Sequence, residues 1–411
     1  MTTQKPPIVR PALSSAEFIA LMGMTFATVA FSIDAMLPAM AEIAAELTPD
    51  APNSAQLIIT SFVLGMGIGT LFTGPLSDTF GRKPIILGGA VVYIIGAALA
   101  WAATSLELVL LARVVQGLGA AGPRIAALAI VRDLYSGRQM ARVMSFVMMV
   151  FSLVPAIAPM IGAGIILLAG WRGIFLAFIL FSLVSVAWLG LRQPETLALK
   201  NRRPFRLGTI AEGTREILRN RQVVLVIAVL SLTFGILFAT ISTTQLVFDQ
   251  TFDRAASFPY WFGAIALVSA LGSLLNARIV VQVGMRQVVR LTFFSQIAFA
   301  GAFALLTVLG AFNDTVMFYL YVIWVLSIFT FAGLTIGNLN ALGMEPLGHL
   351  AGLGASIIGS LATVAAVVLA VIIGLSFNGT ALPIALGTLV CCALGIWLMQ
   401  FLDKTVSGTM A

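Results

Sequence analysis

The chain has 411 residues, of which 60% are apolar and only 9% are charged, and its formal net charge is +7. A mean hydropathy of +1.06 is far above what a water-soluble surface tolerates, so the composition excludes a soluble domain and predicts an all-α membrane protein in a lipid bilayer. The positive residues are spread over many connecting segments, so they indicate no nucleic-acid partner.

Twelve apolar runs are long enough to cross a hydrocarbon layer of about 30 Å as helices. The first run is too long for a signal-peptide core and no A-x-A-like cleavage site follows it, so we expect a retained helix. The predicted spans are 18–41, 54–75, 84–104, 107–131, 142–168, 173–191, 223–247, 258–281, 288–310, 315–341, 351–374 and 381–402.

The positions of lysine and arginine predict the orientation of these spans. With the N-terminus inside, the basic residues of the connecting segments all fall on the inner side, apart from Arg172 and Arg254. Positive residues in short loops are retained in the cytoplasm, so we expect both termini there. Cys391 and Cys392 are adjacent in the last span, where no ordinary disulfide closes, and we expect inert packing residues.

A long polar stretch, residues 192–222, separates six predicted spans from six. We interpret it as a cytoplasmic linker between an N-terminal bundle, 1–191, and a C-terminal bundle, 223–411. A weak internal repeat supports the division, because Gly81-Arg82 after the second span is echoed by Gly284-Met285-Arg286 after the eighth. Parallel halves of this kind place a substrate site between them, near the middle of the membrane.

Three ionisable residues lie well inside predicted spans: Asp34 in the first, and Arg113 and Arg124 in the fourth. An ionised group in the hydrocarbon costs at least a few kcal/mol, so each needs a partner or a water-filled cavity. Asp34 and Arg113 lie at similar depths, roughly 9 Å below the outer boundary, and can meet if their helices are neighbours. The two arginines are eleven residues apart, which returns to within about 20° of one face, so we expect both in one cavity.

Asp34 is the one carboxylate that we place well inside a span, which makes it the leading candidate for a proton carrier. Movement of Arg113, or docking of a cation, would change the protonation of a carboxylate in such a cavity. The alternative is a static ion pair in which Asp34 stays ionised and holds the first and fourth helices together.

Several uncharged polar residues also lie in apolar runs. In membranes their common role is a hydrogen bond between helices, and the alternative is contact with a substrate. We take Gln116, Gln245 and Asn338 as candidate cavity residues; Asn276 and Asn340 belong to the same group. For His349, near the inner start of the eleventh span, we expect a loop role.

The segment from Gly74 to Pro84, between the second and third spans, resembles the signature loop of the major facilitator superfamily, G-x-x-x-D-x-x-G-R-[KR]. The resemblance implies that this loop forms a conformational gate which closes the cytoplasmic side. Asp78 would lie at the positive start of a facing helix and pair with Arg132. The motif residues are Gly74, Asp78, Gly81, Arg82 and Lys83.

Further motifs are similar to those of the drug/proton antiporter branch. Arg113, Gln116 and Gly117 match its R-x-x-q-G motif in the fourth span, which implies that Arg113 takes part in proton transfer. The fifth span resembles the antiporter motif, with Ala158-Pro159 in place of the usual G-P pair. Three segments resemble the bicyclomycin and chloramphenicol exporter subfamily (Bcr/CflA): 32–39, Arg132-Asp133 and 349–356.

The resemblance implies the fold of that superfamily, with twelve transmembrane helices in two six-helix bundles, in a bacterial inner membrane. It implies a proton-coupled antiporter that exports small drug-like or amphiphilic compounds by alternating access. Nothing in the sequence requires an oligomer, so we expect a monomer. Arg124 is not a general feature of the family and favours an anionic or zwitterionic substrate.

Two other functions stay open: a proton-coupled uptake symporter of a small metabolite or organic anion, and a non-transporting receptor or scaffold. The sequence has no Walker-type loop, metal cluster or nucleophile with its base, so we expect no cofactor, no metal and no enzymatic activity.

Overall fold

The computed structural model describes residues 13–202 and 204–407, and within them every regular element is a helix. Residues 1–12 and 408–411, which carry the predicted inner termini, lie outside the described part, and so does the side chain of His349. The longer helices are α1 (Ser15–Asp34), α2 (Met40–Leu47), α3 (Leu57–Phe80), α4 (Arg82–Ala102), α5 (Leu106–Leu134), α6 (Gly137–Arg192), α7 (Leu207–Arg219), α8 (Arg221–Leu246), α9 (Phe258–Val283), α10 (Met285–Leu309), α11 (Asp314–Met344), α12 (Ala351–Leu375) and α13 (Leu382–Ser407).

Within the described residues, eleven helical segments are long and apolar enough to cross a membrane. The predicted fifth and sixth spans, 142–168 and 173–191, both lie in α6, which has 56 residues and is divided by the non-helical Gly170. Gly170 has a φ of 65°, which glycine adopts without strain. Residues of both arms, such as Ile165 and Ala177, line one groove beside α1, so the chain folds back at Gly170.

The segment predicted as the signature loop is almost entirely helical, which corrects the prediction. Helix α3 continues to Phe80 and α4 begins at Arg82, so Gly81 alone joins them. Gly81 has a φ of 108°, and a Cβ built on it would lie 2.5 Å from a carboxylate oxygen of Glu195. Both the backbone conformation and the close approach therefore require glycine.

The predicted linker, 192–222, contains a helix that the polar composition did not reveal. Helix α7 buries Ile217 and packs against α8 and α12. Gly213 of α7 also lies close to Leu353 of α12. The linker is thus held against the membrane-spanning helices over about half its length.

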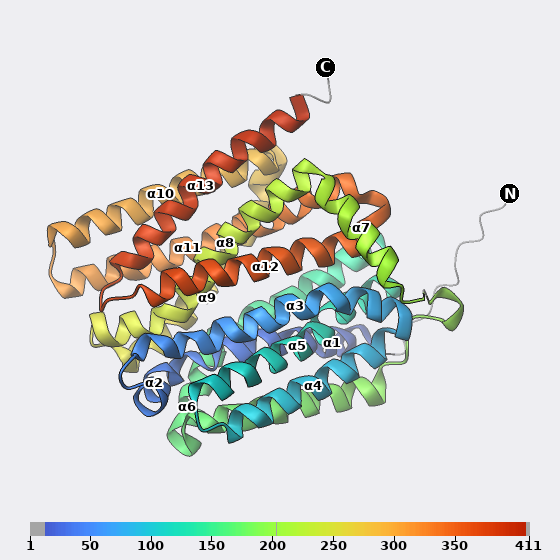
Figure 1. Ribbon diagram of the computed structural model, residues 1–411, viewed down its shortest axis with the longest axis horizontal. Helices are drawn as coiled ribbons and strands as arrows, with labels where there is room; N and C mark the ends of the chain where they lie inside the picture. The colour runs from blue at the N-terminus through green and yellow to red at the C-terminus, as the bar shows by residue number, and fades with distance from the viewer. Residues whose placement is uncertain (1–12, 203, 408–411) are drawn as a thin grey trace.

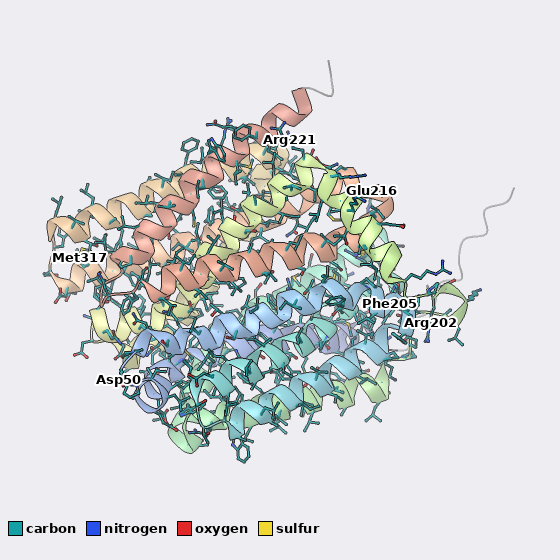
Figure 2. All side chains as sticks on the ribbon, in the orientation of Figure 1. Asp50, Arg202, Phe205, Glu216, Arg221 and Met317 are labelled. Atoms are coloured by element: carbon teal, nitrogen blue, oxygen red, sulfur yellow. The ribbon has the colours of Figure 1, made fainter. Side chains whose placement is uncertain are left out.

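The long helices lie side by side in two groups (Figure 1), with α1 to α6 in blue to green and α8 to α13 in yellow to red. In the first group α5 packs on α3 and α4, and α6 packs on α1 and α4. In the second, α8 packs on α11, α12 and α13, and α10 packs on α11 and α13. The groups meet where α3 packs on α12 and α6 packs on α9. Connecting segments gather at opposite ends, with Asp50 and Met317 at one and Arg202 near the other (Figure 2).

Glycines allow close contact between α3, α4 and α5. A Cβ built on Gly65 would lie 2.1 Å from the carbonyl oxygen of Val114, and one on Gly117 would lie 2.0 Å from that of Phe62. The obstacle in each case is backbone, which cannot move aside as a side chain does. Small residues therefore set the distance between these helices, as is typical of membrane proteins.

We expect Gly117→Ala to destabilise the fold by about 1–3 kcal/mol, because the new methyl group must push α3 away from α5. Gly88→Ala in α4 is the matched control, since a Cβ there meets nothing within 4 Å. Thermal unfolding of the purified variants in detergent measures the difference. Equal melting temperatures for the two variants would contradict the packing argument.

Candidate functional site

Asp34 is the last residue of α1 and is only 5% exposed. Within the described residues no hydrogen bond or ion pair of its carboxylate is found. Gly162, in the fifth predicted span, packs against Ala35, the residue that follows Asp34. A Cβ built on Gly162 would lie 2.1 Å from the carbonyl oxygen of Ala35. The carboxylate is thus buried, and among the described residues it has no positively charged partner.

Arg113 in α5 is completely buried and is held by three acceptors. Its Nε donates to the carbonyl of Ile58 at 3.2 Å, its Nη1 to Gln116 Oε1 at 2.7 Å, and its Nη2 to the carbonyl of Ser32 at 2.9 Å. The guanidinium also lies over the ring of Phe62, 4.4 Å from its centroid. These contacts join α1, α3 and α5 around one cation.

The predicted proximity of Asp34 and Arg113 is partly realised. Arg113 reaches α1, but it contacts the carbonyl of Ser32, two residues before Asp34, and the described residues contain no ion pair between the two side chains. The Ser32 hydroxyl donates to the carbonyl of Thr28, so the hydroxyl of Tyr93 in α4 must donate to Ser32 Oγ. The static ion pair is therefore not the arrangement in this structure.

Arg124, about three turns further along α5, also reaches α3. Its Nη1 lies 3.7 Å from the thioether sulfur of Met66, and the side chain is half-buried. Arg113 and Arg124 thus both contact α3, which agrees with the predicted common face of α5. Arg124 keeps part of its surface accessible, whereas Arg113 is sealed by its acceptors.

The candidate polar residues of the second half have different surroundings. Asn338 in α11 donates to Asn276 Oδ1 of α9 at 2.7 Å, which is the interhelical bond expected of such residues. Gln245, at the end of α8, is 3% exposed, and its Oε1 is without a partner in the described part of the chain. This end of α8 packs on α2 and on the short helix η1 (Leu37–Ala39), which follows Asp34 closely.

The charged residues of the signature segment form a cluster where α3 and α5 end and α4 begins. Arg82 donates to Asp78 Oδ1, and its Nε lies 3.1 Å from Asp133 Oδ2. Arg132, the predicted partner of Asp78, is exposed instead. Asp78 and Arg82 are one helical turn apart across Gly81, so the nearer arginine takes the place predicted for Arg132.

Glu195 belongs to this cluster and was not predicted. Its carboxylate accepts from the backbone N–H groups of Arg82 and Lys83, both at 3.0 Å. Lys83 Nζ in turn donates to the carbonyl of Gly190 at 2.7 Å. Helix α4 begins without a Ser, Thr, Asp or Asn cap, and this missing cap was the signal that a carboxylate from elsewhere must serve its first N–H groups.

Helix α12 makes close contacts at both ends, one with α3 and one with the short helix η2 (Pro52–Gln56), which leads into α3. At the end near the signature segment, a Cβ built on Gly74 would lie 2.7 Å from Ser356 Oγ. At the other end, one built on Gly374 would lie 2.1 Å from Gln56 Oε1. The packing of α12 on α3 thus extends along the length of both helices. Within the residues that the structure describes, no group of three His, Cys, Asp or Glu side chains could hold a metal ion.

We expect Arg113→Lys to lower the free energy of unfolding by about 2 kcal/mol or more, because one ammonium group cannot reach acceptors on α1, α3 and α5 together. Arg124→Lys is the control, since its recorded contact is a single thioether. Thermal unfolding of both variants tests this. An Arg113→Lys variant as stable as Arg124→Lys would contradict the anchoring role.

We expect Glu195→Ala to destabilise the junction of α3 and α4 by about 1–2 kcal/mol, because the backbone N–H groups of Arg82 and Lys83 lose their acceptor. Labelling of Ser356→Cys by a water-soluble maleimide, with Cys391 and Cys392 replaced by alanine, reports opening of the adjacent contact between α3 and α12. The exposed Glu212→Ala in α7 is the control. Unchanged labelling and unchanged stability in Glu195→Ala would show that the Glu195 cap does not keep α3 and α12 in contact.

Known proteins are similar to this chain in sequence and in fold. The model of the Major Facilitator Superfamily matches residues 16–370. A bicyclomycin resistance protein homolog of Haemophilus influenzae is 34% identical over 297 residues, which cover 72% of this chain and 74% of that protein. A chloramphenicol resistance protein of Pseudomonas aeruginosa is 33% identical over 186 residues, 45% of this chain and 42% of that protein.

Solved structures agree in fold at low sequence identity. A D-xylose-proton symporter superposes with a TM-score of 0.71 at 15% identity, covering 94% of this chain and 97% of its own. A human organic anion transporter superposes with a TM-score of 0.61 at 19% identity, covering 97% and 100%. Together with the family match over most of the chain, these similarities show that the protein belongs to the Major Facilitator Superfamily and is a multi-pass membrane transporter rather than an enzyme.

Proposed function

We propose that the protein is a proton-coupled exporter of small drug-like or amphiphilic compounds, working by alternating access in a bacterial inner membrane. Its relatives named for resistance to bicyclomycin and chloramphenicol support export of such compounds. The proposed orientation has both termini in the cytoplasm, and the proposed working unit is a monomer that uses the proton gradient and no cofactor.

The proposed architecture has twelve crossings in two six-helix bundles, 1–191 and 223–411, joined by the linker 192–222. The fold-back at Gly170 supports counting α6 as two crossings. The repeat supports the division, since Gly81 and Gly284 each stand alone between two long helices with a positive φ, of 108° and 84°.

One observation carries the proposed proton coupling: Asp34 is buried and, among the described residues, has no hydrogen bond or ion pair. A permanently ionised carboxylate in this place would be expensive. A carboxylate that alternates between neutral and ionised forms can instead bind a proton in one state and a substrate in the other. Arg113, which is anchored to the carbonyl of Ser32 two residues before Asp34, supplies positive potential when the helices shift.

The proposed cycle begins with Asp34 deprotonated and with substrate entering between the bundles from the cytoplasm. The bundles then rock, a periplasmic proton binds Asp34, and the substrate leaves outward. The cluster of Asp78, Arg82, Asp133 and Glu195 holds the cytoplasmic end shut in the outward-facing state, with Gly74 against Ser356. In this scheme Gln116 positions Arg113, while Arg124 and Gln245 meet the substrate.

The second candidate is a proton-coupled uptake symporter of a small metabolite or organic anion. Arg124 favours it, because this half-buried cation has no carboxylate partner within the described residues and can receive an anionic group. The direction of proton movement relative to substrate separates the two candidates. A receptor or scaffold would move neither.

We expect Asp34→Asn to abolish substrate-dependent proton movement, because an amide cannot exchange a proton. Vesicles with the purified protein and an internal pH-sensitive dye, given a panel of drugs and organic anions, measure the flux. Protons moving opposite to the compound indicate antiport, and protons moving with it indicate symport.

Asp50→Asn, the same change at an exposed connection, is the matched control and should transport normally. Proton-driven transport that survives in Asp34→Asn would rule out the proposed carrier. Wild-type protein that moves no protons with any compound would remove the proposed coupling while leaving the family assignment intact.

A further inference from the structure

The turn between α9 and α10 repeats the turn between α3 and α4. Gly284 stands alone between two long helices with a positive φ, as Gly81 does in the first half. Arg286, two residues after Gly284, donates to the carbonyl of Leu402 in α13 at 3.0 Å. Lys83, two residues after Gly81, donates in the same way to a carbonyl of α6 at 2.7 Å. In each half, a basic side chain thus ties this turn to the last long helix of that half.

The two turns differ at the first N–H groups of the helix that follows. At the first turn the Glu195 carboxylate accepts from two of them, and a Cβ built on Gly81 would lie 2.5 Å from it. The first N–H groups of α10, from Met285 to Gln287, have no side-chain acceptor among the described residues. A Cβ built on Gly284 would meet nothing within 4 Å. The second turn therefore has open space where the first has a carboxylate.

This space belongs to a pocket of about 630 Å³ where α9 and α11 end and α10 begins. Arg286, Gln287 and Arg290 line it from α10, and Leu342 and Glu345 from the end of α11. The Glu345 carboxylate accepts from a glutamine of α8 at 3.2 Å, and the described residues contain no ion pair between it and either arginine. Two cations and the positive end of the α10 dipole thus line one pocket, which favours an oxyanion.

The outer side of this pocket borders the lipid. Val281 and Val283, in the last turn of α9, are 85% and 40% exposed, and Leu291 of α10 is exposed as well. In a membrane-spanning chain, exposed apolar side chains beside a helix end lie where hydrocarbon meets the head groups. Phospholipid phosphates lie at this depth, and basic pockets between helices on the cytoplasmic side are typical sites for anionic head groups. A site for a free anion would need no such apolar rim.

We propose that this pocket binds the phosphate group of an anionic phospholipid, in the position that the Glu195 carboxylate has at the first turn. Arg286 and Arg290 supply positive charge, and the first N–H groups of α10 donate to the phosphate oxygens. The acyl chains then lie along Val283 and Leu291. The proposal depends on the orientation proposed above, but it does not depend on the exporter function, because binding of a lipid needs no transported compound.

The test compares lipid binding by variants of the full-length protein in detergent, measured as the rise in melting temperature during titration with short-chain lipids. Dioctanoyl phosphatidylglycerol carries the anionic phosphate, dioctanoyl phosphatidylcholine is its zwitterionic counterpart, and inorganic phosphate is the free anion. Arg286→Gln removes one cation of the pocket. Arg278→Gln, the same change at an exposed arginine of α9 outside the pocket, is the matched control.

A second variant leaves Arg286 in place. Val281 precedes Gly284 by three residues, as Asp78 precedes Gly81. Val281→Asp therefore brings a carboxylate to the second turn, where it competes with the phosphate for the arginines, and Val281→Asn is its uncharged control. Both changes are on an exposed side chain, so neither disturbs the packing of the helices.

We expect saturable binding of phosphatidylglycerol by the wild type, Arg278→Gln and Val281→Asn, and binding weaker by about fivefold or more in Arg286→Gln and Val281→Asp. Equal affinity for the two lipids, or equal affinity of Arg278→Gln and Arg286→Gln for phosphatidylglycerol, would overturn the proposal. None of these readouts needs proton movement, so the lipid site and the proposed coupling can fail independently.

Two other occupants of the pocket would show themselves in the same titrations. Inorganic phosphate that stabilises the wild type as much as phosphatidylglycerol does would assign the pocket to a free anion. Asp403 follows Leu402 in the sequence, so binding that appears only in Asp403→Asn would assign the pocket to a carboxylate of the chain itself. Either result would overturn the proposal.

Discussion

The burial of the Arg113 guanidinium without a carboxylate is the constraint on which the first half of the molecule depends. A cation at this depth must find acceptors inside the protein, and it finds them on α1, α3 and α5. The three helices are thereby fixed around one side chain, and the glycines that bring α3 against α5 make that convergence sterically possible. Because carbonyl and amide oxygens satisfy the arginine, Asp34 is left without the partner that would hold it ionised.

The far end of the same helices is organised by the opposite arrangement, in which every charge of the signature segment has a partner. Arg82 bridges Asp78 and Asp133, and Glu195 receives the first N–H groups of α4. Glu195 lies just after α6, so the start of the linker is attached to the turn at Gly81. A movement of either bundle that displaces α6 must therefore break the contacts of this cluster or move the whole cluster with α6. The cluster is thus a candidate for a gate with two states.

The sequence predicted the helices well because the length and apolarity of a span are local properties, and even the break near Gly170 fell between two predicted spans. It failed where the outcome depends on partners far along the chain. Polar composition hid α7, which buries Ile217 and packs on α8 and α12. The bridge from Arg82 to Asp133 and the cap supplied by Glu195 follow from how α4, α5 and the linker meet, which no local pattern encodes. The sequence predicted that Asp34 and Arg113 lie inside the helix bundle, and both are buried, but it did not predict the relative direction of their side chains.

That direction follows from helix geometry in the four residues from Phe31 to Asp34. Successive side chains turn by 100°, so Ser32 points toward Tyr93 and α4, while Asp34 returns to within about 60° of Phe31. The Asp34 side chain thus leaves α1 near the side of Phe31, which packs on Phe178 and Phe181 of α6, while Arg113 is held by the backbone carbonyl of Ser32. Because Arg113 already contacts the carbonyl of Ser32, a small rotation of α1 about its axis would change the distance between the Asp34 carboxylate and the guanidinium.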